Sequence, residues 1–440
     1  MQTLHLSDVR CFRNSVDVPL TPLTFFVGEN SAGKSTALAL IRLAWDVAYS
    51  TLTPNFNEEP FLLGSYEHIA HYHGGRGKRT TSFSIGLTDK STDGDSKVIA
   101  RFIDSGGQPE LDQWTLSSGN MSITLCLAGE QSGRASIQYK GMIIPIPKSL
   151  EFIHLARTLN QGPLHVIGFL AFRLHEQPEL QEQIAQSASV TRDVIKTIAG
   201  ILRRLSTFAR GRTLRPYAMA PIRSRPSRTY EPTSATPTPE GTHTPTSLAR
   251  IYRPSAPAQQ AKQQELLKGF GSATGLFSIL GVRRLGNSRK TSDPFQVTVR
   301  LPDQQGDRNI VDVGYGVSQV LPVVVDLLAH PSNVMLLQQP EVHLHPRAQA
   351  ELGSFLAQRT NQSDRIIVET HSDYLIDRVS MAVRRQQIPA ENVSVLFFDR
   401  NPSGNVDIHP LKYDSNGQLQ DPPPQYRSFF LKEQDRLLGG

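Results

Sequence analysis

Apolar and polar residues alternate at the start of the chain, and the spacing then changes. Residues 3–9 alternate as a half-buried strand does, and residues 22–28 form a short apolar run that ends in glycine. Apolar residues then recur at helical spacing through residues 36–49, TALALIRLAWDVAY. The pattern predicts two strands, a glycine-rich connection and a helix.

The next stretch predicts an antiparallel sheet followed by helices. Between residues 80 and 147, short β-like runs such as TTSFSIGL and MSITLCL are separated by Gly, Asp and Ser. From residue 149 to about residue 207 the spacing is helical, as in SLEFIHLARTLN and TRDVIKTIAGILRRL. Residues 230–250 are rich in Pro, Thr and Ser, which predicts a loop or a mobile segment.

Strand-like and helix-like segments alternate again after residue 260. Strands are predicted at 296–302, 333–339, 365–370 and 393–399, and helices at 319–330 and 347–360. Such alternation favours a mostly parallel sheet. We therefore expect an α/β fold with a mostly parallel core sheet, an antiparallel β subdomain and an inserted helical region. The expected domain limits are 1–148, 149–265 and 266–440.

Composition narrows the class of protein. The 440 residues include 38% hydrophobic and 20% charged residues, which is enough to bury a core. Two cysteines cannot supply a disulfide framework, so a cytoplasmic location is expected. The N-terminus has no signal-peptide core, and no apolar stretch is long enough to cross a membrane. A net charge of +6 permits an acidic partner without implying one.

Residues 28–35, GENSAGKS, match the pattern G-x-x-x-x-G-K-[ST] between a predicted strand and a predicted helix. Glycines let successive backbone N–H groups point into one concavity, and the helix N-terminus adds partial positive charge. Lys34 can reach the β- and γ-phosphates of a nucleotide, and Ser35 can ligate Mg²⁺. A glycine turn that only caps a helix is the minor alternative, because every fixed position is filled.

Two predicted parallel strands end in polar residues, and phosphate-binding α/β folds gather their chemistry at such ends. One strand ends in LLQQPE, with Gln338, Gln339 and Glu341, and VHLHP follows it. The other ends in VETHSD, with Glu369 and His371. A histidine at this position can donate to a γ-phosphate oxygen.

Taken in order, GENSAGKS, GYGVSQ, LLQQPEVHLHP and VETHSD resemble an ABC-type ATPase head. More narrowly, they resemble the SMC-like and OLD-like ATPases of bacteria, which often occur in anti-phage defence operons. The resemblance covers about residues 1–75 and 300–400. It implies a homodimer, or a higher homo-oligomer, whose heads close around ATP and Mg²⁺.

The resemblance also assigns roles to single residues. The Walker A loop would end at Thr36, and the signature motif, presented to the ATP of the opposite subunit, would begin at Gly314. The residues that would hold the nucleotide are Asn30, Ser31, Ala32, Gly33, Lys34, Ser35, Thr36, Gly316 and Ser318. Mg²⁺ would be held at Ser35 and Gln338, and the catalytic residues would be Glu341, Gln339 and the switch histidine His371.

Three features depart from the family pattern. The family has an Asp where this chain has Gln338 and a catalytic Glu where it has Gln339; an amide adds no charge and cannot take a proton. The signature reads GYGVSQ rather than LSGGQ. No glutamine lies between residues 36 and 107 to act as a Q-loop, so Glu67 or His68 would substitute. We expect Glu341 to be the general base, with Glu369 as the alternative, and hydrolysis to be slow.

Histidine groups and a basic stretch offer further candidate sites. His68, His71 and His73 lack acidic or Cys partners, so a solvated polar loop is favoured over a metal site. His343 and His345 are interpreted as local structure and dimer contacts rather than metal ligands. Residues 194–230 contain no Asp or Glu and could contact nucleic acid, form a solvated face or dock an acidic protein. The arginines of this stretch are Arg203, Arg204, Arg210, Arg212, Arg215, Arg223, Arg225 and Arg228.

These features favour a regulatory ATPase whose nucleotide-gated head dimer controls a separately encoded effector of nuclease or toxin type. No stretch after residue 400 is long enough to be a complete nuclease. One alternative is a DNA-repair ATPase that clamps DNA, which the basic stretch favours. Another is a scaffold that holds ATP without hydrolysing it, which the two glutamines favour. A transporter subunit fits less well, because the Q-loop is missing and residues 80–300 form a large insertion.

Overall fold

The structure is a computed structural model. It describes residues 2–75, 78–91, 94–128, 133–146, 162–210, 214–232, 236–253, 257–286, 293–330, 334–360 and 365–426. The chain forms two compact units, each assembled from separate segments. The first unit comprises Met1–Leu20, Glu29–Arg215 and Asp399–Ile408, and the second comprises Thr21–Gly28, Pro216–Phe398 and His409–Gly440. The domain limits at residues 148 and 265 stay a prediction.

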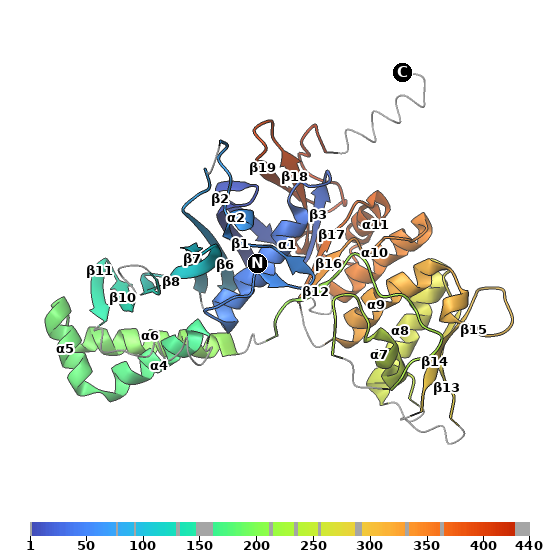
Figure 1. The fold of residues 1–440 in the computed structure, drawn as a ribbon, viewed down its shortest axis with the longest axis horizontal. Helices are drawn as coiled ribbons and strands as arrows, with labels where there is room; N and C mark the ends of the chain where they lie inside the picture. Colours follow the sequence, from blue (N-terminus) through green and yellow to red (C-terminus); the bar gives the residue numbers. More distant parts are fainter. Residues whose placement is uncertain are drawn as a thin grey trace. The chain divides into compact units, whose positions relative to one another are not determined.

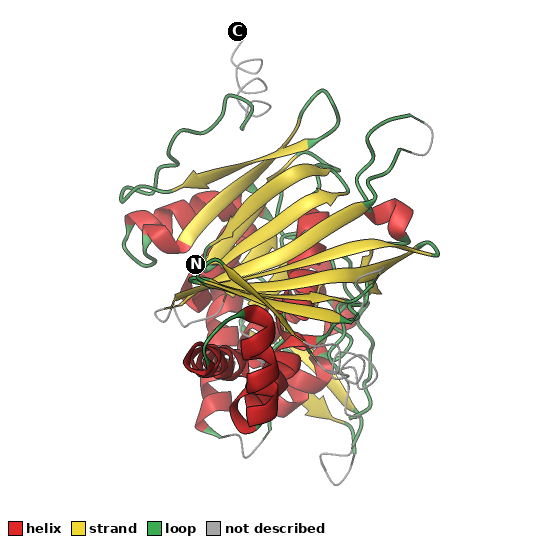
Figure 2. Cartoon of the chain, turned by 90° about the vertical axis from the view of Figure 1, so that its left-hand side faces the viewer, coloured by secondary structure: helices red, strands yellow, loops and turns green. Residues whose placement is uncertain are grey.

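An eight-stranded antiparallel sheet organises the first unit (Figure 2). Its order is β11-β10-β9-β8-β7-β6-β1-β2, so β6 to β11 follow one another in chain order, and the predicted meander is confirmed. The strands are β1 (Gln2–Val9), β2 (Phe12–Leu20), β6 (Ser82–Ser91), β7 (Gly94–Ser105), β8 (Gln108–Ser118), β9 (Met121–Cys126), β10 (Arg134–Tyr139) and β11 (Met142–Ile146).

Strand β2 was absent from the prediction for residues 1–27, which contain three strands rather than two. It lies at the edge of the sheet, pairs with β1 and exposes most of its middle residues. An edge strand of this kind needs few apolar residues, so the hydrophobic pattern of FRNSVDVPL is weak.

Helices of the first unit follow the predicted order. Trp114 of β8 donates its indole N–H to the carbonyl oxygen of Val47 at 2.8 Å, which ties the sheet to the segment after the first helix. The predicted helix at 149–160 lies outside the described residues. The elements are α1 (Lys34–Trp45), a π-helix η1 (Asp46–Ser50), α2 (Tyr66–Ile69), α4 (Pro163–Glu176), α5 (Pro178–Ala188), α6 (Arg192–Arg210) and the short strands β4 (Asn57–Glu58) and β5 (Phe61–Leu62).

A second sheet of six strands has the order β12-β16-β17-β3-β18-β19. The pairings from β12 to β18 are parallel, which confirms the predicted mostly parallel core. Every residue of β16 is buried, as expected of a strand covered on both faces, and helices lie beside the strands in Figure 1. The elements are β3 (Leu23–Gly28), β12 (Tyr217–Met219), β16 (Val334–Gln338), β17 (Arg365–Glu369), β18 (Val393–Arg400), β19 (Val406–Lys412), α9 (Tyr315–Ala329), α10 (Pro346–Thr360), α11 (Asp373–Arg384) and the 3-10 helix η4 (Ala390–Asn392).

The remaining part of the second unit contains a three-stranded antiparallel sheet and two helices. Buried residues of these elements join the same core as the six-stranded sheet. The elements are α7 (Thr244–Ile251), α8 (Ala258–Thr274), β13 (Ile279–Arg284), β14 (Phe295–Arg300), β15 (Arg308–Asn309) and the 3-10 helix η3 (Ile310–Asp312).

The Pro/Thr-rich stretch is better ordered than its composition predicts. Its second half contains α7, in which Leu248 is 1% exposed. His243, just before α7, contacts Asp326 of α9 through Nε2 at 2.8 Å, and both side chains are buried. The prediction of a loop or mobile segment is therefore wrong for this half, because α9 supplies the buried partner that the stretch lacks by itself.

Among the described residues, no helix has both the length and the apolar character needed to cross a bilayer.

Candidate functional site

The phosphate loop leads from β3 into α1. Ser31 (φ 62°) and Gly33 (φ 88°) adopt left-handed backbone conformations, which curl the loop. Lys34 is 3% exposed, and its Nζ donates to the carbonyl oxygen of Glu29 at 2.7 Å. The ammonium group therefore lies over the curled backbone, where a phosphate group would need a positive charge.

Two arginines of the first unit hold this loop. Arg400 donates to the carbonyl oxygen of Ser31 at 2.9 Å. Arg10 donates to Thr36 Oγ1 at 3.2 Å and to the carbonyl oxygen of Leu63 at 2.8 Å. Through these two contacts, Arg10 links the start of α1 to Leu63, which lies just before the segment where a Q-loop would be expected.

Gly33 is also required by a close contact. A Cβ atom at this position would lie 2.5 Å from Cys11 Sγ. Burial raises the pKa of the Cys11 thiol to about 11, so it packs as a neutral, unreactive group. The left-handed loop, the lysine and the exposed Ser35 fit a triphosphate and its Mg²⁺.

In the second unit, the two polar strand ends meet at one edge of the sheet. Gln338 is the register partner of Glu369, and Glu369 is the partner of Phe26 in β3. Since these strands are parallel, their carboxyl ends share this edge. Gly28, the first residue of the phosphate-loop motif, ends β3 at the same edge.

The chain turns sharply after β16. Gln339 has a left-handed backbone (φ 42°), and its N–H donates to the carbonyl oxygen of Glu369 at 2.8 Å. Gln338 is 7% exposed, and its Nε2 has no hydrogen-bond partner among the described residues. The two amides thus occupy the predicted strand end.

Glu341 ties this turn to the end of β17. It is 7% exposed, and its Oε1 accepts a hydrogen bond from the backbone N–H of His371 at 2.8 Å. Burial raises the pKa of Glu341, and the His371 N–H and the charge of Arg223 oppose this effect. A buried carboxylate with a raised pKa is suited to accept a proton.

His371 lies at the surface on a rigid support. Its side chain is exposed, whereas Thr370 beside it is fully buried and donates its N–H to the carbonyl oxygen of Phe26 at 3.1 Å. Ser372 caps α11 by accepting from the N–H of Leu375 at 3.2 Å. The imidazole is therefore presented from a fixed backbone.

Arg223 is a part of this edge that the sequence pattern did not identify. Its side chain is 2% exposed and donates to the carbonyl oxygens of Gln338 at 3.0 Å and Gln339 at 3.3 Å. Its backbone N–H donates to Gln319 Oε1 of α9 at 3.3 Å. Burial lowers the pKa of Arg223 to about 10 and the charge of Glu341 opposes this, so the guanidinium stays charged at neutral pH. The only sequence signal is an arginine soon after the short strand YAM.

The second glycine stretch packs against the turn that follows β16. A Cβ atom on Gly316 would lie 2.8 Å from the carbonyl oxygen of His343. The rings of Tyr315 and His343 meet edge to face with centroids 5.1 Å apart. Ser318 donates its hydroxyl to the carbonyl oxygen of Tyr315 at 2.8 Å. The stretch is thus part of a helix start, with Gly314 exposed at its tip.

The histidines at 68, 71 and 73 do not form a solvated loop throughout. His71 is 4% exposed and its Nδ1 lies 2.5 Å from the carbonyl oxygen of Arg10, so that part of the prediction is wrong. His68 is exposed and follows Glu67 in the short helix α2. No group of His, Cys, Asp and Glu in the described parts of the chain could hold a metal ion. His345, before α10, is exposed and helps to start that helix.

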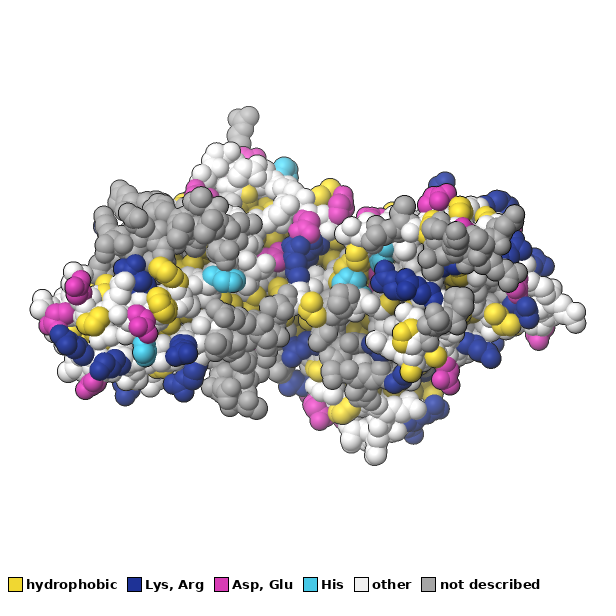
Figure 3. Space-filling view, turned by 90° about the horizontal axis from the view of Figure 1, so that it is seen from below, with side chains coloured by type: hydrophobic (Ala, Val, Ile, Leu, Met, Phe, Trp, Pro, Cys, Tyr) yellow, Lys and Arg dark blue, Asp and Glu magenta, His cyan; other side chains and the backbone are white. Residues whose placement is uncertain are grey.

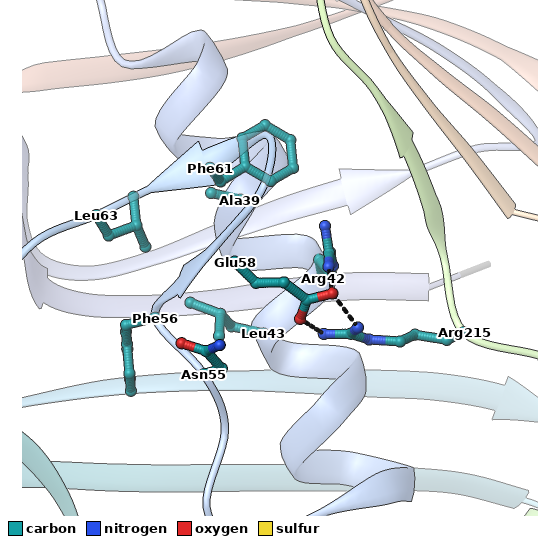
Figure 4. Close-up of a pocket in the computed structure, with 9 residues that line it drawn as sticks. All are labelled: Ala39, Arg42, Leu43, Asn55, Phe56, Glu58, Phe61, Leu63 and Arg215. Atoms are coloured by element: carbon teal, nitrogen blue, oxygen red, sulfur yellow. Dashed lines mark hydrogen bonds and ion pairs between the residues drawn. The ribbon is translucent and has the colours of Figure 1, made fainter. Parts of the chain in front are cut away.

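The basic stretch is divided among several environments. Arg215 pairs with Glu58, as Figure 4 shows, and also with Asp46, and Arg228 pairs with Asp312. Figure 3 shows Lys and Arg side chains in separate groups on the face in view. Arg223 is buried, so three arginines of the stretch, Arg215, Arg223 and Arg228, are engaged by acceptors within the described residues. Arg212 and the side chain of Arg210 lie outside the described residues.

One part of the chain is similar to a known protein family. Residues 211–377 match a family model described as "AAA domain, putative AbiEii toxin, Type IV TA system". The matched residues include both polar strand ends. No curated protein matches this chain.

Solved structures of SMC heads are similar over most of the chain. The SMC head of Thermotoga maritima is 11% identical, with 93% of this chain and 97% of that chain covered and a TM-score of 0.42. A head with an extended coiled coil, bound to the C-terminal domain of ScpA derived from Pyrococcus furiosus, is 10% identical, with 99% and 100% covered and a TM-score of 0.42. An SMC head bound to the C-winged helix domain of ScpA is 12% identical, with 93% and 97% covered and a TM-score of 0.41.

Proposed function

We propose that this protein is an ABC-type ATPase that binds ATP, hydrolyses it slowly and uses nucleotide-gated pairing of two heads to regulate a separate effector. The observation that carries the proposal is the position of Gly28. This residue ends β3 beside the polar ends of β16 and β17 and begins the phosphate loop. A phosphate-binding loop that leaves the carboxyl edge of a parallel sheet is the arrangement of a nucleotide site.

The residues of the loop bind the triphosphate in this proposal. Backbone N–H groups of residues 29–35 and the Lys34 ammonium group hold the β- and γ-phosphates. Ser35 and Gln338 would hold Mg²⁺, which would neutralise phosphate charge. His371 donates to the γ-phosphate, and Glu341 accepts a proton from the attacking water.

Slow turnover follows from the two amides. Neither Gln338 nor Gln339 can take a proton, so Glu341 is the nearest following carboxylate that can act as base. Its Oε1 is already engaged by the N–H of His371, and its Oε2 is buried, so water reaches this carboxylate less easily than an exposed one. A base that is partly committed to holding the fold should act less efficiently than a free one.

The proposal also includes the pairing of two heads and the regulation of a separate effector. Gly314 and Tyr315 are exposed at the start of α9, where a partner head could be contacted. The printed description of the matched family model names a toxin and a TA system, which supports an effector of toxin type. An anti-phage role remains part of the proposal. The internal pairing of Arg215, Arg223 and Arg228 makes a DNA clamp the weaker alternative.

The test is ATP turnover by the full chain, with Lys34→Ala as the loop variant. Turnover above background that Lys34→Ala abolishes supports the ATPase. Tight ATP binding without turnover favours the non-hydrolysing scaffold instead, and no ATP binding overturns both. Light scattering with and without ATP then measures pairing, and a pull-down under the same two conditions identifies a protein effector or DNA.

A further inference from the structure

A cavity of about 260 Å³ lies in the second unit, between α7, α9, β14 and the segment that follows Arg223. Its lining includes Ser318, Leu321 and Pro322, which share one face of α9, and no residue of the phosphate loop. The volume is near the lower end for ligand pockets, about 300 Å³, so only a small ligand would fit. The cavity therefore shares Ser318 with the second glycine stretch and no residue with the phosphate loop.

One side of the cavity is apolar. Leu248 of α7, Val297 of β14, Ile310 of η3 and Leu321 of α9 all line it, and each is at least nine-tenths buried. These four side chains come from four elements, so the apolar wall is built by the fold rather than by one helix. A wall of this kind favours a ring or a short hydrocarbon chain.

The other side is polar and lacks acidic residues. Thr244 is 4% exposed, and its Oγ1 is buried without a hydrogen-bond partner among the described residues. A buried hydroxyl without a partner is costly, and a ligand oxygen could satisfy it. Ser224 and Ser227 add two more hydroxyl groups to this wall.

Arg225 gives the cavity a positive charge. Arg215, Arg223 and Arg228 of the same basic stretch each donate to a carboxylate or a carbonyl group. Arg225 is exposed, lines the cavity and makes no ion pair within the described part of the chain. Because no Asp or Glu lines the cavity, this guanidinium selects for an anion.

We propose that this cavity binds a small organic anion, namely an apolar ring or chain that carries one phosphate or carboxylate group. The apolar body lies against Leu248, Val297 and Ile310. The anionic group lies between the Arg225 guanidinium and the hydroxyl wall, where Thr244 donates its proton. Since Ser318 and Leu321 belong to α9, the ligand contacts the helix that begins at the second glycine stretch.

The test is methyl-labelled NMR on the full chain with saturating ADP, which keeps phosphate probes away from the phosphate loop. The probes are phenyl phosphate, phenylacetate and the neutral benzyl alcohol. We expect at least one anionic probe to shift the methyl signals of Leu248, Val297, Ile310 and Leu321 and to bind more tightly than benzyl alcohol. The stronger of the two anions then identifies the preferred acidic group.

Three variants separate binding at this site from a general attraction of anions to the protein. Arg225→Gln should weaken the anionic probe by about three- to tenfold, as expected for loss of one charge-assisted bond at a partly exposed site, and leave benzyl alcohol unchanged. Arg204→Gln removes the same charge from α6 and should have no effect. Thr244→Val should weaken the anion while the same methyl groups still respond.

Three results would overturn the proposal. They are the absence of shifts at these methyl groups, equal weakening by Arg225→Gln and Arg204→Gln, and equal affinity for benzyl alcohol and both anions. The measurement involves no turnover, so its outcome does not depend on the proposed ATPase activity.

Discussion

The ion pairs of Arg215 lead to a sharp prediction about the basic stretch. Arg215 donates through Nε to Asp46 Oδ1 at 2.7 Å. It also donates through Nη1 to Glu58 Oε1 at 2.7 Å (Figure 4). The Asp46 side chain is only 4% exposed, and Arg42 also contacts Glu58. Asp46 begins η1, directly after the helix that follows the phosphate loop. Arg215→Met would therefore leave a buried carboxylate without its main partner.

The magnitude follows from the burial of the two partners. Removing one partner of a fully buried ion pair costs about 3–5 kcal/mol. The Arg215 side chain is 37% exposed, and Arg42 remains nearby, so solvent and the second arginine reduce this cost. We expect a loss of about 2 kcal/mol in the free energy of unfolding. For a unit of this size, the midpoint of thermal unfolding should fall by about 4–8 °C.

Arg228→Met is the matched control, because it removes another paired arginine from the same stretch. Arg228 and Asp312 are both largely exposed, and loss of such a pair should not change the unfolding midpoint measurably. Both variants are measured by calorimetry or circular dichroism in the same buffer. The wild-type protein is measured at several scan rates to show whether the unfolding midpoint depends on the scan rate.

The pH dependence gives a second, independent readout. Burial raises the pKa of Asp46, and Arg215 lowers it, so Arg215→Met raises it further. A carboxyl group whose pKa is raised in the folded state loses stability as pH rises above its unfolded pKa of about 3.9. The cost of Arg215→Met should thus grow from acid to neutral pH. Equal effects of the two variants, or a cost that does not depend on pH, would show that Arg215 belongs to a free basic surface.

Three variants test the nucleotide site itself. Glu341→Gln should lower ATP turnover by about a hundredfold or more, because a general base contributes about that much, and it should leave ATP binding intact. Unchanged turnover would refute Glu341 as the base. Gln339→Glu restores a carboxylate at the family's position and should raise turnover by about tenfold or more, and no gain would mean that this side chain does not reach the water. Gly316→Ala places a Cβ 2.8 Å from the carbonyl oxygen of His343 and should cost about 1–3 kcal/mol and weaken ATP-dependent pairing measured by light scattering. Gly269→Ala on α8 is the control, because a Cβ at that position meets no atom within 4 Å.

The features that the sequence predicted correctly are local ones. The strands β16 and β17 are short apolar runs, and the meander from β6 to β11 has turn residues between its strands. Each of these is set by neighbouring residues, because periodicity and glycine spacing act over a few positions. The same local patterns also predicted a parallel sheet whose strands end in polar residues.

The features that the sequence did not predict depend on distant partners. Arg223 meets Gln338 across a sequence separation of 115 residues, and Arg215 meets Asp46 across 169. In the sequence, these arginines belong to one basic run, and only the fold assigns them to separate acceptors. The same reason explains α7, whose preceding residue His243 is fixed by Asp326 of α9.

The buried Arg223 also changes how the two glutamines are interpreted. If carboxylates replaced the amides at positions 338 and 339, this edge would carry four acidic side chains together with Glu341 and Glu369. Glu341 and Glu369 are already buried. Such a group is stable only when cations compensate it, because buried like charges repel strongly. With amides, Arg223 holds the strand end through its carbonyl oxygens, and Glu341 holds the adjacent strand end through the N–H of His371. The edge therefore keeps its shape through these hydrogen bonds, and in the proposed mechanism the base is Glu341, the first carboxylate after the two glutamines.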